Sequence, residues 1–172
     1  ATVHFKAWKR TFDVLLPPEH LFSEDDYLHH VDGKPRLDGI ASFFQSRSMT
    51  VPQGTGLDDA PEQTMHGLAK RKQQLFLEML ARDGVPVFES TVRFIRHLRA
   101  QGLKTAVVSS SKNCKMVLEQ AGLQDLFETR VDGVSLDELG LAGKPEPDMF
   151  LEAARHIEVM PEHALVVEDA LS

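Results

Sequence analysis

The segment Leu103-Lys104-Thr105-Ala106-Val107-Val108-Ser109-Ser110-Ser111 decides the fold. Its first six residues are a short, largely apolar run between turn signals, which predicts a buried strand at 103–108. The run Ala164–Val167 has the same character and predicts a second strong strand, and residues 129–131 predict a weaker one. Because helical patterns separate these runs, the chain after residue 85 is predicted to be α/β, with a doubly wound parallel sheet covered by helices on both faces.

Apolar residues at helical spacing predict the remaining elements. After residue 85 the predicted helices cover 92–98, ending at Gly102, then 114–121, stopped by Gly122, and 150–157. Before it they cover 3–15, ended by Pro17-Pro18, a short acidic stretch capped by Ser23, a segment around 40–44, and about 61–81, closed by Gly84. Residues 51–60 are predicted to be a loop. With no strand predicted before Val85, we expect a helical domain at 1–84 and an α/β domain at 85–172.

Composition argues against several classes of function. The chain has 172 residues, 42% of them hydrophobic, which is enough for one sizeable core and a small satellite. A net charge of −7 argues against nucleic acid as a partner. Cys114 is the single cysteine, so no intrachain disulfide is possible, which fits a reducing compartment. No stretch is apolar enough for a membrane span and no signal peptide is visible, so we expect a cytoplasmic protein without membrane contact.

Three polar segments occur in a fixed order. Ser109 follows the first predicted strand, Lys144 lies in the loop Gly143–Asp148 that opens a helix, and Glu168-Asp169 follow the last predicted strand. Ligands of parallel sheets bind at the carboxyl ends of the strands, so the three segments are expected to meet at one edge. A hydroxyl, an ammonium and two carboxylates suit a phosphoryl group held with a divalent cation, and oxygen-only ligands favour Mg²⁺.

Each segment taken singly also has an ordinary structural explanation. Ser111 could cap the next helix, Lys144 could be a solvated loop lysine, and Glu168-Asp169 could be a capped helix start. For the serine and the lysine that explanation is the stronger one. Two adjacent carboxylates after a buried strand are harder to explain, because they repel each other unless a cation is bound. The order and spacing of all three segments together are far more specific than any one of them.

Together these motifs resemble those of the haloacid dehalogenase superfamily of phosphotransferases. Val108–Ser111, Gly143-Lys144-Pro145 and Glu168-Asp169 match its second, third and fourth motifs. Its β-phosphoglucomutase-like subgroup resembles the chain most, on the segments His4–Lys9, Val31–Arg36, Leu68–Lys72 and Ser109–Asn113. The resemblance covers essentially the whole chain. It implies a Rossmann-like phosphotransferase core at 85–172 and a small helical cap at 1–84, which includes the N-terminal hinge.

The resemblance implies phosphoryl transfer through an aspartyl-phosphate, with Mg²⁺ as cofactor. A second aspartate, two residues after the nucleophile, would protonate the leaving oxygen. Ser109 and Lys144 would hold the phosphoryl oxygens, and Asp169, assisted by Glu168, would bind the metal. In a mutase the phosphate returns to another hydroxyl of the sugar through a bisphosphate. The substrate would then be a small phosphorylated sugar, held by a cap that excludes water.

The resemblance also assigns roles outside these motifs. Arg36 would bind the distal phosphate, Lys72 would contact the sugar, and His4 would assist the acid/base aspartate. The residues that would line the phosphate and sugar pocket are Ser110, Ser111, Lys112 and Asn113. The alternatives are ordinary ones: a solvated helix face at Lys70–Lys72, a surface arginine at position 36, and a histidine that packs beside Trp8. Cys114 lies on the apolar stripe of its helix and is interpreted as a core residue.

One motif of the superfamily has no match. The first motif, Asp-x-Asp at a strand end, does not occur in the 172 residues. Its strand would lie between those ending at Ser109 and Glu168, and each buried backbone group orphaned without it would cost ~1–3 kcal/mol. We therefore expect this chain to be part of a longer polypeptide, with a core incomplete at both ends. We also expect the 172 residues alone to be inactive, because Ser109, Lys144 and Asp169 cannot replace the nucleophile.

Three functions compete at this stage. The first is a Mg²⁺-dependent β-phosphoglucomutase, which interconverts β-glucose 1-phosphate and glucose 6-phosphate. The second is a sugar-phosphate or phosphoglycolate-type phosphatase, in which water takes the phosphate. Arg36 and the Lys70–Lys72 cluster favour the mutase, because they supply a second anion site. The third is a non-catalytic fragment or pseudoenzyme that binds phosphate or a partner, which the missing nucleophile favours if Ala1 is the true start of the protein. A monomer or weak homodimer is expected.

Overall fold

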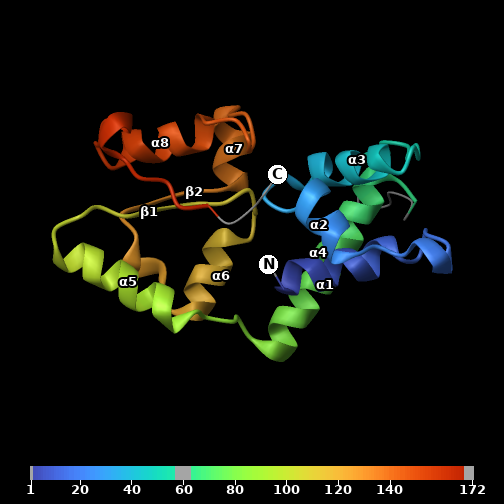
Figure 1. Ribbon diagram of the computed structural model, residues 1–172, viewed down its shortest axis with the longest axis horizontal. Coiled ribbons are helices and arrows are strands. Elements are labelled where there is room, and N and C mark those ends of the chain that lie inside the picture. Colours follow the sequence, from blue (N-terminus) through green and yellow to red (C-terminus); the bar gives the residue numbers. More distant parts are fainter. Residues whose placement is uncertain (1, 57–62, 169–172) are drawn as a thin grey trace. The chain divides into compact units, whose positions relative to one another are not determined.

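The computed structural model describes residues 2–56 and 63–168. These residues form two compact units, a helical unit at 2–84 and an α/β unit at 85–168 (Figure 1). Within the described ranges the first unit contains helices but no strand, and the second alternates helices with two short strands. None of the helices in these ranges has the length and apolar character that a membrane crossing demands.

Four α-helices and one 3₁₀ turn make up the described part of the helical unit. They are α1 (Thr2–Phe12), η1 (Pro18–His20), α2 (Glu24–His30), α3 (Arg36–Ser46) and α4 (Met65–Asp83). Helix α4 packs against α1 and α3, and α2 packs against the same two helices. Residues 51–56 have no regular structure, as predicted for the loop, and the rest of that predicted loop lies outside the described residues.

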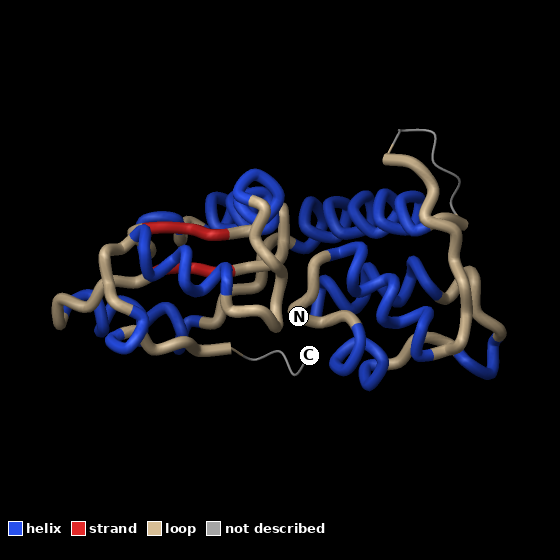
Figure 2. The backbone as a smooth tube through the Cα atoms, turned by 90° about the horizontal axis from the view of Figure 1, so that it is seen from above, coloured by secondary structure: helices blue, strands red, loops and turns tan. Residues whose placement is uncertain are grey.

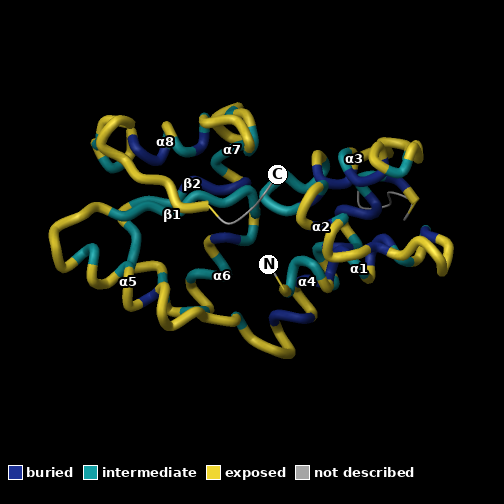
Figure 3. Tube along the Cα trace, in the orientation of Figure 1, coloured by how far each residue is buried: buried dark blue, intermediate teal, exposed yellow. Residues whose placement is uncertain are grey.

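Aromatic rings form the core of the helical unit, along the buried stretches that Figure 3 marks in dark blue. Phe12, Phe22 and Phe43 are fully buried. The Phe12 ring centroid lies 4.7 Å from that of Phe43, 5.0 Å from that of Phe22 and 4.9 Å from that of Trp8. Ring pairs at such distances contribute ~0.5–1.5 kcal/mol each beyond the burial of their area. This cluster fixes α1 against α3 and against the segment that precedes α2.

A reciprocal capping box begins helix α2 and confirms the predicted role of Ser23. The Asp26 N–H donates to Ser23 Oγ at 3.1 Å, and the Ser23 N–H donates to Asp26 Oδ2 at 2.9 Å. Arg47, at the end of α3, donates to both carboxylate oxygens of Asp26, at 2.9 and 2.8 Å. The start of α2 is thereby tied to the end of α3.

Two helix ends in this unit differ from the predicted ones. Helix α4 begins four residues later than predicted, because Thr64 Oγ1 accepts the Gly67 N–H at 3.1 Å and caps the helix there. Helix α1 ends three residues earlier than predicted. At Asp13 the chain leaves the helix, and its carboxylate accepts the Phe22 N–H at 2.9 Å. Side-chain hydrogen bonds of this kind compete with the helical ladder.

Four α-helices, two strands and two 3₁₀ turns make up the described part of the α/β unit. They are α5 (Glu89–Ala100), β1 (Ala106–Val108), α6 (Cys114–Ala121), β2 (Thr129–Val131), α7 (Gly133–Leu139) and α8 (Asp148–His156), with 3₁₀ turns at Gln124–Leu126 and Pro161–His163. The strands lie side by side (Figure 2) and pair in parallel, as predicted. In Figure 1, α7 and α8 lie on one side of the strands and α5 and α6 on the other.

The core of the α/β unit lies between the strands and α8. Val131 and Met149 are fully buried, and Ala153 packs with them. Helix α7 was not predicted, and the residue before it explains why it forms. Asp132 Oδ1 accepts the N–H groups of Val134 at 2.9 Å and Ser135 at 3.2 Å, which caps the helix.

The prediction of a strong buried strand at 164–167 is wrong for this structure. Residues 164–168 are irregular, and the side chains of Leu165 and Val167 are 91% and 83% exposed. An apolar run becomes a strand only beside a ladder partner, and in the described residues β1 pairs with β2 alone. The first strand is also shorter than predicted. It covers 106–108, is half-buried, and leaves Leu103 54% exposed.

Truncation of Phe43 tests the aromatic core. We expect Phe43→Ala to lower the free energy of unfolding of the helical unit by about 3–5 kcal/mol, because it leaves a cavity in a fully buried ring cluster. The matched control Val14→Ala removes an exposed side chain of the same unit and should change it by less than ~0.5 kcal/mol. Urea unfolding followed by the fluorescence of the single tryptophan, Trp8, measures both. Equal effects of the two variants would contradict the assignment of the core.

Candidate functional site

Helices α1 and α4 bring together four side chains of the helical unit. His4 and Trp8 are one turn apart on α1, and Lys72 and Phe76 are one turn apart on α4, so each pair lies on one face of its helix. Lys72 Nζ lies 2.7 Å from His4 Nδ1. The same ammonium lies 4.7 Å from the Phe76 ring centroid and 5.3 Å from that of Trp8. His4 stacks on Phe76, with centroids 4.3 Å apart.

Burial sets the charge states in this group. The side chain of Lys72 is buried, with 3% of the residue exposed, and burial together with the nearby charge of Arg36 lowers its pKa to about 7. Burial and the charges of Lys72 and Arg36 lower the pKa of His4 to about 2. His4 is therefore neutral near pH 7, its Nδ1 accepts the hydrogen bond from Lys72, and its proton lies on Nε2. The alternative that Lys72 belongs to a solvated helix face is wrong, whereas Lys70 is exposed.

Arg36 enters the same region from the first turn of α3. Its Nη2 donates to Gln73 Oε1 at 2.6 Å. Burial lowers the pKa of the Arg36 guanidinium below its ordinary value. In the part of the chain that the structure describes, no carboxylate forms an ion pair with Lys72 or Arg36. The group, which we call the cationic cluster (His4, Arg36, Lys72), therefore suits an anion.

The serine segment of the α/β unit forms the turn between β1 and α6. Ser109 Oγ accepts the Ser111 N–H at 3.2 Å, and Ser111 Oγ accepts the Asn113 N–H at 3.2 Å. Helix α6 starts after Asn113, so the alternative that Ser111 is its N-cap is wrong. The Ser109 N–H donates to the Val131 carbonyl oxygen at 3.0 Å and continues the pairing of the strands.

The start of helix α7 packs directly against this serine turn. A Cβ on Gly133 would lie 2.6 Å from the Ser110 carbonyl oxygen and 2.8 Å from the Lys112 nitrogen, which is closer than a side chain allows. Lys112 also forms an ion pair with Asp137 on the same helix. The turn that carries the predicted pocket residues is thus held in place by α7.

Lys144 and Glu168, which were predicted from separate segments, form an ion pair. The side chain of Lys144 is 10% exposed, and its ammonium lies 5.1 Å from the Phe150 ring centroid. Asp169, the other predicted metal ligand, lies outside the described residues. Residues 2–56 and 63–168 contain no group of three or more His, Cys, Asp or Glu side chains that could hold a metal ion. Of the two predicted metal ligands, the structure therefore describes only Glu168, and its carboxylate is paired with the Lys144 ammonium.

Cys114 is buried, as predicted, and lies among the polar groups of this unit. Burial and the charge of Asp132 raise the pKa of its thiol to about 11, against the smaller opposing effects of the charges of Arg130 and Lys144. Sequence reasoning missed Asp132, which is 1% exposed. Its Oδ2 forms an ion pair with Arg130 Nε at 2.5 Å. An aspartate directly after a strand and before a glycine was the signal for this helix cap.

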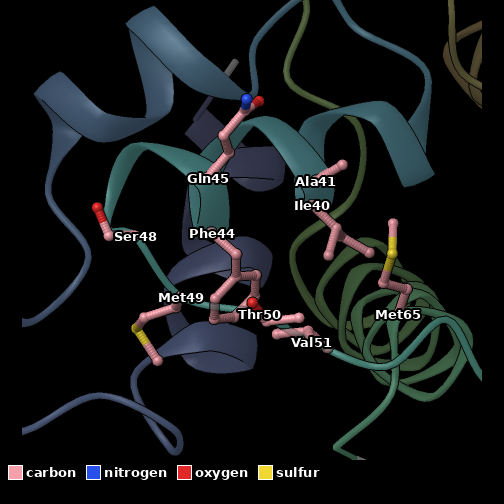
Figure 4. A pocket seen from close by; sticks show the side chains of 9 residues that line it. All are labelled: Ile40, Ala41, Phe44, Gln45, Ser48, Met49, Thr50, Val51 and Met65. Atoms are coloured by element: carbon pink, nitrogen blue, oxygen red, sulfur yellow. The ribbon is translucent and has the colours of Figure 1, made fainter.

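A pocket of about 400 Å³ lies elsewhere in the helical unit (Figure 4). Its walls come from the second half of α3, the residues after it and the start of α4. They are Ile40, Ala41, Phe44, Gln45, Ser48, Met49, Thr50, Val51 and Met65. No wall residue is charged, and none belongs to the predicted site. A phosphorylated ligand needs cations, so we place the candidate site at the cationic cluster and not in this pocket.

Comparison with known proteins gives a consistent result. A family model described as a haloacid dehalogenase-like hydrolase matches residues 2–172. A β-phosphoglucomutase of Mycobacterium bovis is 43% identical over 181 residues, which cover all of this chain and 69% of the relative. Two thirds of that relative's length is therefore represented here.

Solved structures show the same fold at low sequence identity. A β-phosphoglucomutase from Clostridium difficile has a TM-score of 0.69 at 19% identity, over 94% of this chain and 66% of the other. CbbY from Rhodobacter sphaeroides, solved in complex with xylulose-(1,5)bisphosphate, has a TM-score of 0.68 at 18% identity, over 95% of this chain and 69% of the other. At these identities the likeness concerns the fold alone.

Replacement of Lys72 by methionine tests its burial. Because the pKa of Lys72 falls from 10.5 to about 7 on folding, its ammonium destabilises the folded protein fully below about pH 7, and the cost disappears as the pH rises through 10.5. We expect Lys72→Met to stabilise the protein by about 3–5 kcal/mol more at about pH 7 than at a pH above 10.5. Urea unfolding followed by circular dichroism at the two pH values gives this difference.

The matched control is Lys70→Met, which replaces an exposed lysine one half-turn away on the same helix. Its effect on the free energy of unfolding should be small and should not change between the two pH values. A pH-independent effect of Lys72→Met would show that the Lys72 ammonium is solvated.

Proposed function

This chain belongs to the haloacid dehalogenase-like hydrolase family and, within it, to the β-phosphoglucomutase-like subgroup, and we propose that the protein interconverts β-glucose 1-phosphate and glucose 6-phosphate. The observation that carries the proposal is the cationic cluster of the helical unit, present in addition to Lys144 of the α/β unit. A mutase moves phosphate between two hydroxyls through a bisphosphate, so it must hold two anionic groups. A phosphatase needs to hold one.

In this proposal the α/β unit holds the phosphoryl group that is transferred. Lys144 neutralises its oxygens as a compact point charge, and the Ser109 hydroxyl donates a hydrogen bond to it. The low exposure of Lys144 supports this role, because a phosphate–ammonium contact is stronger out of water. Ser110, Ser111, Lys112 and Asn113 then line the pocket on the turn that helix α7 holds in place.

Magnesium is the cofactor that we propose, in keeping with the general use of Mg²⁺ by phosphotransferases of this family. The carboxylates that would hold it are Glu168 and Asp169, whose oxygen donors suit Mg²⁺. When bound, the ion would offset charge on the transferred phosphoryl group. The nucleophile that we propose is an aspartate of the Asp-x-Asp motif, which these 172 residues do not contain.

The helical unit supplies the groups that distinguish a mutase in this proposal. The Arg36 guanidinium binds the distal phosphate with its planar fork, and Lys72 binds the sugar phosphate beside it. His4 cannot act as an acid itself near pH 7, because its pKa is about 2. Its Nε2–H is instead a fixed donor, which would orient the carboxylate of the acid/base aspartate. CbbY was solved with a sugar bisphosphate, and this supports a two-phosphate ligand in this fold.

Phosphorus NMR tests the proposal on the complete gene product that contains this sequence, given β-glucose 1-phosphate and Mg²⁺. A growing glucose 6-phosphate signal is the expected result. Inorganic phosphate without glucose 6-phosphate would overturn it in favour of the phosphatase, and an unchanged substrate signal would overturn it in favour of a non-catalytic protein. The 172 residues alone serve as the control that lacks the nucleophile, and we expect no turnover from them.

Removal of the Arg36 guanidinium tests the second anion site. We expect Arg36→Ala to raise the KM for β-glucose 1-phosphate roughly 10–100-fold, because a charged hydrogen bond to phosphate contributes about 1.5–3 kcal/mol. Arg36→Lys should recover only part of the loss, since a lysine lacks the planar fork. The control Arg10→Ala changes an exposed arginine of the same unit and should leave KM within twofold, roughly. Unchanged KM in Arg36→Ala would contradict the role of Arg36.

A further inference from the structure

The Phe76 ring contacts two members of the cationic cluster. Its centroid lies 4.3 Å from that of the His4 ring, with an interplanar angle of 28°. The Lys72 ammonium lies 4.7 Å from the same ring. Trp8 also faces the ammonium, at 5.3 Å. Phe76 is 2% exposed, so its ring is fixed by the surrounding core.

The contacts of Phe76 do two different physical things. A ring face offers a region of negative potential, which stabilises a desolvated ammonium where no carboxylate does so. Stacking, in contrast, fixes the plane of the neutral His4 ring, and hence the direction of its Nδ1 lone pair and its Nε2–H. The 2.7 Å bond from Lys72 to His4 Nδ1 requires both partners to be held at once. One ring therefore holds both the donor and the acceptor.

We propose that Phe76 is a positioning residue, whose ring keeps the Lys72 ammonium charged and directed at His4 so that the cationic cluster can bind a phosphate dianion. Phe76 is not placed in contact with the substrate, and it acts through Lys72 and His4. The inference rests on the proposed function for its role in turnover. The stabilisation of the buried Lys72 ammonium by the Phe76 ring can be tested without measuring turnover.

Charges of one sign surround Lys72 and explain why a ring is used. The titratable and charged groups of the described residues that act on the Lys72–His4 pair are these two side chains and Arg36. A carboxylate at position 76 would neutralise the cluster and compete with the phosphate. A ring face stabilises the cation without cancelling its charge, so the cluster stays available to an external anion.

Lysine side-chain NMR on the ligand-free protein tests this directly. The Cε signal of ¹³C-labelled lysine, assigned by its loss in Lys72→Met, reports the titration of Lys72. We expect Phe76→Leu, which keeps an apolar side chain and removes the ring face, to lower the pKa of Lys72 by about one further pH unit. Phe76→Tyr keeps the ring and should leave the titration within ~0.3 units of the original protein.

Phe22→Leu is the matched control. It is the same substitution at another fully buried ring of the helical unit, one that packs on other rings and over which the described residues place no cation. We expect it to lower stability at least as much as Phe76→Leu does and to leave the titration of Lys72 unchanged. A Lys72 titration that is unaltered in Phe76→Leu, or altered equally in Phe22→Leu, would overturn the proposal.

The pH dependence of KM separates this inference from the proposed function. In Phe76→Leu the KM at about pH 7 should rise roughly fivefold, because the charged fraction of Lys72 falls, and it should recover toward about pH 6. The kcat should change less than KM. A shifted titration in an inactive protein would overturn the proposed function and support the positioning role. An unshifted titration of Lys72 in Phe76→Leu of an active protein would overturn the positioning role and support the proposed function.

Discussion

The packing of helix α1 against helix α4 is the contact on which the candidate site of the helical unit depends. Each helix presents a polar and an aromatic residue one turn apart, His4 with Trp8 and Lys72 with Phe76, and the two faces meet. Residues four apart project in one direction, so a single interhelical contact places all four side chains. Helix α1 is also fixed against α3 by the ring cluster around Phe12, which couples the geometry of the site to the core of the unit.

The buried ammonium of Lys72 destabilises the folded state. A buried lysine without a carboxylate partner lowers the stability of the folded state, and for Lys72 this cost is largest below about pH 7 and disappears as the pH rises through 10.5. A methionine would fill the same space without this cost. Sites that keep such a group exchange stability for a function that needs the charge. The electrostatics of this unit are therefore better explained by ligand binding than by folding.

The sequence predicted local features well and features that depend on distant partners poorly. The helix cap at Ser23 and the stop at Gly122 follow from side-chain and backbone chemistry within a few residues. The apolar run at 164–167 could not be settled in this way, because a strand exists only beside a partner. The burial of Lys72 could not be predicted from the sequence either. Its neighbours in the sequence are basic, and only the approach of α1 from 68 residues away removes it from water.

The two units compensate their buried cations by different physical means, which in the proposed function would suit them to different phosphate groups. In the α/β unit, Lys144 is paired with Glu168, so its charge is compensated inside the protein and an incoming phosphoryl group must compete with that carboxylate or arrive with a cation of its own. In the helical unit, Lys72 and Arg36 are compensated by ring faces and an amide oxygen, which leave the net charge in place. The first arrangement suits a group that is bound and released at each transfer. The second leaves a net positive charge, which in the proposed function would hold the part of the ligand that does not react.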